Sequence, residues 1–460
     1  FPVWYCGECD EAVMAEKEDL PVDPLSDDPP VDACPACAHD EFVPEDDVLD
    51  TWATSSLTPL INAGWDWDAE EEAFTMENPE LFPMDVRPQG HDIISFWLFH
   101  TVVKCYEHTG EVPFDSVMIN GMVLDEDRRK MSKSVGNVVT PAEVKAEFPV
   151  DAARFWAAGS SIGDDLPYQQ KGLRAGEKLM QKLWNASKLV DSLTPEERPD
   201  VAADDLSALD RWLLAELDQE TEFVAEKLEN REFSKARDSL RSFFWGTFCD
   251  DYLEIAKQRL SDGGDTSTEF TLLQAHRTFL QLFAPFLPHI TEELWERCYD
   301  EDSSIHTTDW PTAGGYDADL EAGETAMEVV SALRRYKTEH GLPLNADLDH
   351  VEVYGHVAGF EDAIAEAMHV ETLDAYDEAP DITTEVSGID LDYSLVGPEF
   401  GSEVGAIDAA IEDGDYEIDG DELHVAGVTL TDEMFAVEES RTYSGEGEMT
   451  ETESAVVVVR

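Results

Sequence analysis

Apolar residues recur at steps of three and four from about residue 172 to residue 299, and this period constrains the fold more than any other feature. The apolar positions of the first two helices are Leu206, Leu209, Leu213, Leu217, Val224 and Leu228, then Phe233, Leu240, Phe244, Phe248, Tyr252 and Ile255. Gly263–Gly264 are expected to end the second helix, and two more helices are expected at 268–284 and 289–299. Helices joined by such short connections predict an antiparallel bundle over residues 172–320.

The pattern changes on both sides of this bundle. The predicted elements there are a buried helix at 92–106, a strand at 116–124, a helix at 321–338, and strands at 350–354 and 455–459. Residues 47–171 and 321–460 are therefore predicted as two separate α/β domains. The fold class is multidomain, with α/β parts and an all-α part.

Residues 1–46 carry two C-x-x-C pairs. These are Cys6–Cys9 and Cys34–Cys37, with 24 residues between the pairs. Two such pairs predict a tetrahedral site in which four thiolates bind one structural Zn²⁺ ion. Two disulfides, or a site that has lost its metal, are the alternatives. We expect this cysteine module to close a small knob and to perform no catalysis.

The chain is strongly acidic, with 103 Asp and Glu against 30 Lys and Arg, a formal net charge of −73 and a pI of about 4.1. Such self-repulsion is largely screened at molar salt, where the Debye length falls to about 3 Å. We interpret the charge as adaptation to a salt-rich cytoplasm, with an acidic surface for a basic partner as the alternative. No apolar run is long enough to predict a membrane span, and no signal peptide is recognised. Because residue 1 is Phe, we expect the chain to be a piece of a longer protein.

The densest basic cluster lies in a polar loop after the strand at 116–124. It contains Lys130, Met131, Ser132, Lys133 and Ser134. Two ammonium groups on a loop next to a glycine can close over a polyphosphate and stabilise charge that develops as it reacts. An exposed basic turn without function is the alternative.

This loop string resembles the signature of class I aminoacyl-tRNA synthetases. Further segments over residues 1–340 resemble the valyl-tRNA synthetase family: Asp47-Val-Leu-Asp-Thr-Trp52, Gly90-His-Asp-Ile-Ile94, Phe244-Trp-x-x-Phe-Cys-Asp250 and Pro285-Phe-Leu-Pro288. The resemblance implies the second half of a Rossmann-type catalytic domain at 47–171 and an anticodon-binding bundle at 172–320. It also implies ATP-dependent attachment of L-valine to tRNA(Val), with Mg²⁺ assisting. The chain contains no H-I-G-H string, so the first half of the active site and the editing domain are expected to lie outside it.

The resemblance assigns roles to individual residues. Lys133, helped by Lys130, is expected to stabilise the departing pyrophosphate. The residues expected to bind ATP are Gly90, Asp92, Met122, Val123, Lys130, Met131, Ser132, Lys133 and Ser134. The expected walls of the valine pocket are Trp52, Ile93 and Trp97, with ordinary core packing as the alternative. Ala53 stands where the family usually has Phe, which leaves the packing around Trp52 open.

The expected partners are L-valine, ATP and tRNA(Val), bound by a cytoplasmic monomer. Arg334, Arg335 and Lys337 are the first candidates for tRNA contacts, and a solvated helix end is the alternative. Three other functions remain open: an isoleucyl- or leucyl-type synthetase, a nucleotidyl transferase of related fold, and a non-catalytic RNA-binding module. The fragment alone is expected to be inactive.

Overall fold

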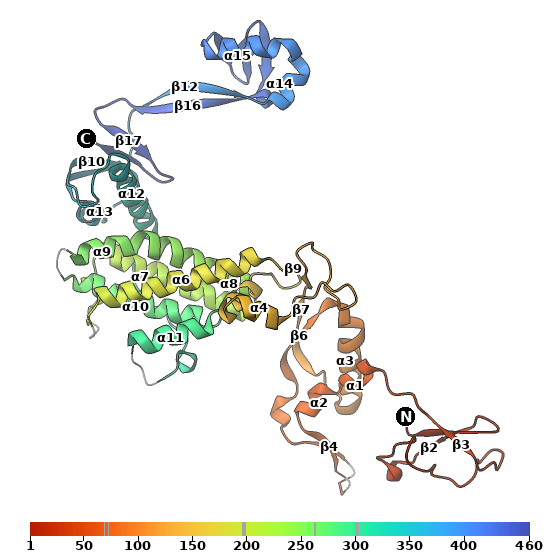
Figure 1. The fold of residues 1–460 in the computed structure, drawn as a ribbon. Coiled ribbons are helices and arrows are strands. Elements are labelled where there is room, and N and C mark those ends of the chain that lie inside the picture. The colour runs from red at the N-terminus through yellow and green to blue at the C-terminus, as the bar shows by residue number, and fades with distance from the viewer. Residues whose placement is uncertain (69, 72, 196–198, 262–263, 300–302) are drawn as a thin grey trace. The chain divides into compact units, whose positions relative to one another are not determined.

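The computed structural model describes all residues from 1 to 460 except 69, 72, 196–198, 262–263 and 300–302 (Figure 1). The contacts divide the chain into two units. The first contains residues 1–143 and 160–169, and the second contains residues 144–159 and 170–460. The predicted boundary at residue 171 therefore differs from this division, because residues 144–159 pack within the second unit. Within the described residues, no helix is both long and apolar enough to cross a membrane.

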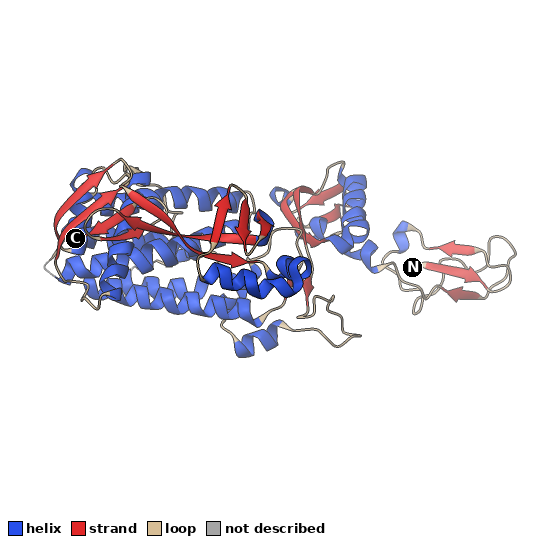
Figure 2. Cartoon of the chain, turned by 90° about the horizontal axis from the view of Figure 1, so that it is seen from above, coloured by secondary structure: helices blue, strands red, loops and turns tan. Residues whose placement is uncertain are grey.

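The first unit begins with the cysteine module, which consists of strands, loops and a 3₁₀ turn at Lys17–Asp19 (Figure 2). Its antiparallel sheet has the order β2-β1-β3, formed by Ala12–Met14, Val3–Cys6 and Phe42–Pro44. The elements that follow are α1 (Thr51–Ser55), α2 (Thr58–Asn62), β4 (Trp65–Asp68), β5 (Ala73–Met76), β6 (Met84–Gly90), α3 (Phe99–Thr109), β7 (Phe114–Asn120), β8 (Val123–Leu124) and β9 (Leu166–Pro167). Strands β6 and β7 are parallel, as are β8 and β9.

Two predicted elements of this unit are corrected by the structure. The strand expected at 116–124 is interrupted after Asn120, and the next residue, Gly121, packs against the backbone of Asp164, where a Cβ would lie 2.1 Å from the carbonyl oxygen. The helix expected at 92–106 instead begins as a 3₁₀ turn, continues as a π-helical turn at Ile94–Leu98 and becomes α3. That helix is not buried as expected. Its contacts with α1 and α2 cover one side only, and Phe96 and Phe99 are exposed.

The second unit contains the predicted bundle. Its helices are α5 (Val150–Ala157), α6 (Gln170–Leu193), α7 (Ala208–Glu229), α8 (Phe233–Phe243), α9 (Leu253–Ser261), α10 (Thr266–Phe283) and α11 (Pro288–Tyr299), with α4 (Pro141–Glu147) at the border of the units. A π-helical segment, Phe244–Tyr252, joins α8 to α9 and carries the fully buried Phe244, Phe248 and Tyr252. The predicted end of the second helix at Gly263 lies outside the described residues.

One buried carboxylate connects four segments of this bundle. Asp210 of α7 is fully buried, and its Oδ1 accepts hydrogen bonds from Tyr252 Oη at 2.6 Å and Arg259 Nη1 at 2.8 Å. Its Oδ2 accepts from Ser267 Oγ at the start of α10. Burial alone would lower the pKa of Arg259, but the Asp210 carboxylate holds that pKa above its ordinary value. Asp210 and Arg259 thus form a buried ion pair, and we call this pair with Tyr252 and Ser267 the Asp210 network.

The C-terminal part of the second unit has a sheet of order β11-β10-β18-β17. Its elements are α12 (Leu320–Glu339), β10 (Leu348–Tyr354), α13 (Glu361–Met368), β11 (Val370–Tyr376), β17 (Glu448–Glu451) and β18 (Val456–Val459). The predicted strands at 350–354 and 455–459 are thus present and pair directly, with Val351 opposite Val459. The core of this part is continuous with the core of the bundle.

A two-stranded ribbon extends from that sheet to a small module with a core of its own (Figure 1). The ribbon pairs β12 (Ile382–Leu391) with β16 (Phe435–Tyr443). The module contains α14 (Tyr393–Phe400), α15 (Val404–Glu412), β13 (Tyr416–Asp419), β14 (Glu422–Val425) and β15 (Val428–Thr431). The predicted domain at 321–460 therefore contains two hydrophobic cores.

Candidate functional site

The turn after β6 brings several of the predicted site residues together. In the parallel pair β6–β7, Gly90 lies opposite Asn120, so the carboxyl ends of both strands lie at one edge. A Cβ on Gly90 would lie 2.7 Å from Asp92 Oδ1 and 3.8 Å from Met122 Sδ. A larger residue here would push against the Asp92 side chain, whereas glycine leaves the backbone open. Ligands of α/β sheets bind outside the carboxyl ends of the strands, where this turn lies.

The basic loop is held in place by residues that the sequence analysis did not single out. Asn137 donates from Nδ2 to Asp125 Oδ2 at 2.8 Å and to the carbonyl oxygen of Lys130, while its Oδ1 accepts from the backbone N–H of Ser132. The hydrogen bond from Asn137, together with Arg129, lowers the pKa of Asp125. Burial by itself would raise the pKa of Asp125, but these hydrogen bonds outweigh it and keep the carboxylate ionised as the anchor of the loop. The sequence feature that pointed to this anchor was the Gly136-Asn137 pair, shortly after the two lysines.

The two loop lysines have different surroundings. Lys130 Nζ lies 3.1 Å from Asp92 Oδ2, which joins the basic loop to the turn after β6. Lys133 is exposed, and within the described residues no ion pair is recorded for it. Ser132 Oγ and Ser134 Oγ are 3.1 Å apart, and Met131 is half-buried. The loop therefore presents one paired and one free ammonium group.

The predicted pocket walls lie at the start of α1 and on the π-helical turn. Asp50 caps α1 by accepting from the backbone N–H of Trp52, and the Trp52 ring stacks on Phe96 with centroids 5.9 Å apart. Trp97 Nε1 donates to the carbonyl oxygen of Ser55 at 3.2 Å. Ile93 is half-buried, as are both indoles.

Ala53 and Val123 also lie in this region. Ala53, whose small side chain departs from the family, accepts a hydrogen bond on its carbonyl oxygen from Lys104 Nζ. Val123 is 46% exposed, so its side chain is available to a ligand at this edge.

Arg87 is a buried cation beside this region that sequence reasoning missed. It is 5% exposed, its guanidinium lies over the Trp97 ring, and burial lowers its pKa to about 10. Its Nε and Nη2 have no hydrogen-bond partner among the described residues. Burial also raises the pKa of the neighbouring Cys105 thiol to about 11. A charge in the middle of a strand, in Asp85-Val-Arg87-Pro, was the available signal.

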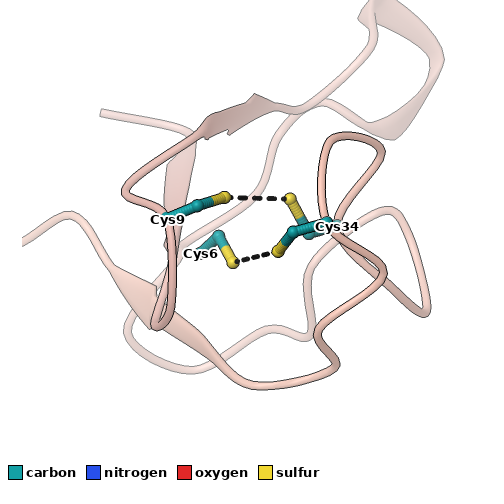
Figure 3. A group of neighbouring side chains, drawn as sticks. Cys6, Cys9 and Cys34 are labelled. Atoms are coloured by element: carbon teal, nitrogen blue, oxygen red, sulfur yellow. Dashed lines mark hydrogen bonds between the residues drawn. The ribbon is translucent and has the colours of Figure 1, made fainter.

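The four cysteines of the module converge, as Figure 3 shows for Cys6, Cys9 and Cys34. All four Sγ atoms lie within 4.8 Å of one another, with Cys6–Cys37 at 3.5 Å and Cys9–Cys34 at 3.6 Å. A tetrahedral site with Zn–S bonds of about 2.3 Å places sulfurs about 3.8 Å apart, so the cluster fits Zn²⁺ closely. No disulfide joins them, because each of the four is a free thiol in the structure.

The metal site gives the first testable prediction. The intact protein is expected to carry one Zn²⁺ per chain, and Cys34→Ser is expected to remove it, because three thiolates and a hydroxyl bind the ion much more weakly. Elemental analysis of purified protein measures the metal content. Cys298→Ser, outside the cluster, is the matched control and should retain the ion. Zinc that stays bound to Cys34→Ser would rule out this ligand set.

The structure corrects one of the predicted tRNA contacts. Lys337 is fully buried, and its Nζ donates to the carbonyl oxygens of Leu344, Ala346 and Met368 at 2.7–2.8 Å. All three of its protons are thus used, two by carbonyl groups of the loop that follows α12 and one at the C-terminal end of α13, where a cation is favoured. Lys337 is a structural residue. Arg335 is exposed, and Arg334 donates to the carbonyl oxygen of Asp250.

Two family models match the chain in separate segments. Residues 2–169 match the model described as tRNA synthetases class I (I, L, M and V). Residues 210–353 match the model described as anticodon-binding domain of tRNA ligase.

Individual proteins also resemble the chain. It is 81% identical over 460 residues to a valine--tRNA ligase of Haloarcula marismortui, covering 100% of this chain and 51% of that protein. It is 39% identical to a valine--tRNA ligase of Methanothermobacter thermautotrophicus, covering 88% of this chain and 46% of that one. The chain thus spans about half the length of the curated relatives it matches. A LeuRS–tRNA–LeuAMS complex from Agrobacterium radiobacter K84 shares the fold, with TM-score 0.50, 22% identity, and 70% of this chain and 42% of that chain covered.

Proposed function

We propose that the chain is part of a class I tRNA synthetase, and that the protein containing it attaches L-valine to tRNA(Val) with consumption of ATP. The observation that carries the proposal is the contact between the basic loop and the turn after β6. Lys130 pairs with Asp92 beside the open backbone of Gly90, while Lys133 stays free. A polyphosphate and a ribose can be held at one strand edge by this arrangement.

The proposed reaction begins with attack of the valine carboxylate on the α-phosphorus of ATP, which gives valyl-adenylate and pyrophosphate. The carboxylate is already a nucleophile, so the residues of the site position the reactants and stabilise charge. Asp92 accepts from ribose hydroxyls, and Met122 and Val123 flank the adenine. Lys133, helped by Lys130 and by the loop residues Met131, Ser132 and Ser134, neutralises the departing pyrophosphate. Mg²⁺, when bound with ATP, supplies further charge neutralisation on the phosphates.

The amino acid and the RNA occupy other parts of the protein. Trp52, Ile93 and Trp97 form the walls of a small apolar pocket for the valine side chain. Arg334 and Arg335 remain candidates for tRNA contacts. The cysteine module holds a structural Zn²⁺ ion. The acidic composition suits a salt-rich cytoplasm, and the protein acts there as a monomer.

The function is tested by ATP–pyrophosphate exchange with the full-length protein in molar KCl. We expect valine to support exchange with a kcat/KM at least about tenfold above isoleucine and leucine, because one methylene group changes discrimination by about 1–3 kcal/mol. Preference for isoleucine or leucine would assign the related synthetases instead. The absence of exchange with any amino acid would leave a nucleotidyl transferase or a non-catalytic RNA-binding module.

A further inference from the structure

Helix α1 is too short to fix its own position. It has five residues, Thr51–Ser55, and none of them is fully buried. A helix of this length has little stability in isolation, because nucleation costs more than its few hydrogen bonds return. Its place in the fold therefore depends on the side chains that bind its two ends. Trp52, one of the proposed walls of the valine pocket, moves with it.

The N-terminal end of α1 is held only by its own segment of the chain. The Asp50 carboxylate accepts from the backbone N–H groups of Trp52 and Ala53. Residues 46–50, which lead into the helix, are all exposed. This cap stabilises the first turn but does not connect α1 to the rest of the unit.

The C-terminal end of α1 is bound by side chains of α3 and of the π-helical turn before it, against which α1 packs (Figure 1). Lys104 Nζ of α3 donates to the carbonyl oxygen of Ala53, which also accepts from Ser56 Oγ at 2.6 Å. Trp97 Nε1 donates to the carbonyl oxygen of Ser55 at 3.2 Å. The connection between α1 and α3 thus runs through carbonyl groups of the last turn of α1.

Lys104 is the charged group in this connection. It is half-buried, and no ion pair is recorded for it within the parts of the chain that the structure describes. The half-buried Lys227 of the bundle, by contrast, pairs with Glu226 and Glu232. The ammonium group of Lys104 is therefore directed at the carbonyl end of α1, where a cation is favoured.

The two indoles proposed as pocket walls are held in different ways. Trp97 is bound on its ring by Arg87, which lies over it, and on its Nε1 by the Ser55 carbonyl oxygen. Trp52 stacks on Phe96 with centroids 5.9 Å apart, but its backbone belongs to α1. The separation of the two indoles therefore follows the separation of α1 and α3.

We propose that Lys104 is a positioning residue that sets the width of the amino-acid pocket and with it the discrimination between valine and isoleucine. It touches no substrate and acts through α1 and Trp52. This inference rests on the proposed function, because it takes Trp52 and Trp97 as walls of the valine pocket. Without the ammonium group, the Ala53 carbonyl oxygen loses a donor and α1 is free to move away from α3. A wider pocket then admits the additional methylene group of isoleucine.

The test compares substitutions of two half-buried lysines in the full-length protein. Lys104→Met keeps the length of the side chain and removes the donor, whereas Lys104→Arg keeps a charged donor. Lys227→Met is the matched control, because the side chain of Lys227 is 16% exposed and lies in the bundle. ATP–pyrophosphate exchange in molar KCl gives kcat/KM for valine and for isoleucine. The ratio of the two values does not depend on the fraction of enzyme that is folded, so a purely structural role for Lys104 would leave it unchanged.

We expect the valine-to-isoleucine ratio to fall about tenfold in Lys104→Met, at the low end of what one methylene group contributes to discrimination. The KM for valine should rise, and the KM for ATP should stay unchanged. Lys104→Arg should restore most of the ratio, because arginine can also donate to the last carbonyl groups of a helix. Lys227→Met should keep the ratio of the unmodified protein.

An unchanged ratio in Lys104→Met would overturn the proposal, as would an equal fall in Lys227→Met. If Lys104→Met does not fold, Lys104→Gln takes its place, since it is neutral and its shorter side chain brings the donor less far toward α1. The same fall in the ratio is then expected, and its absence would overturn the proposal. An unmodified protein that activates no amino acid would refute the proposed function itself. Activation of valine with a ratio that does not respond to Lys104 would refute this inference alone.

Discussion

Replacing Lys133 by alanine in the full-length protein is expected to slow adenylate formation by about two to three orders of magnitude. A single donor that stabilises developing charge is typically worth about 2.7–4 kcal/mol in a transition state. Lys133 suits this role because it is exposed and has no recorded ion pair in the described parts of the chain, so its charge is available to pyrophosphate. Lys130 is already paired with Asp92 at 3.1 Å. Single-turnover kinetics of ATP consumption with valine measures the effect.

Two comparisons make the Lys133 prediction specific. Lys145→Ala removes an exposed lysine of α4 outside the loop and should leave adenylate formation almost unchanged. Lys133→Arg keeps the charge and should restore part of the lost rate. The affinity for valine should change little in Lys133→Ala, because the ammonium group acts on the leaving group. Valine binding weakened as much as the rate would show that the lysine has another role.

The helical part of the fold could be predicted from the sequence because its signal is local. Leu209, Leu213 and Leu217 repeat at the helical period, and all three are buried as expected. The interrupted strand, by contrast, lies beside a long-range contact, the close approach of the Asp164 carbonyl oxygen to Gly121. No period in the sequence contains that information. The exposed face of α3 was missed for a similar reason, since a run of apolar residues does not reveal which neighbours cover it.

In the candidate site too, some residues could be found from the sequence and others only from the structure. The loop lysines and the glycine turn were found from their residue types and spacing, and the structure brings Lys130 to Asp92, 38 positions away in the chain. Asn137 and Arg87 were missed because their importance depends on burial and on partners that the sequence does not identify. Lys337 was assigned to RNA as part of a basic cluster, but it lies against two carbonyl groups of the loop after α12 and one at the end of α13. The role of a charged residue can therefore be judged only when its burial is known.

The Asp210 network also depends on contacts that no local pattern predicts. Its removal is expected to have a large effect on the stability of the bundle. Asp210→Ala is expected to destabilise the bundle by about 3–5 kcal/mol, because Arg259 would keep a charge without its buried partner. The side chain of Arg259 is 9% exposed and also pairs with Asp265 at 2.5 Å. Tyr252 and Ser267 would each lose an acceptor as well. Hydrogen exchange of the α7 and α10 amides in molar KCl measures the loss of local stability.

A double variant separates two causes of the lost stability, the charge left on Arg259 and the packing lost with the Asp210 side chain. In the double variant Asp210→Ala with Arg259→Met, the cation that would keep only Asp265 as a partner is removed, so part of the stability should return, and the two substitutions should not be additive. Glu222→Ala removes an exposed carboxylate from the same helix and should change stability by less than about 0.5 kcal/mol. Two substitutions whose effects simply add would show that Asp210 and Arg259 stabilise the bundle independently. In that case the ion pair would not hold α7 against α9 and α10, and the bundle would owe its helix arrangement to its aromatic core alone.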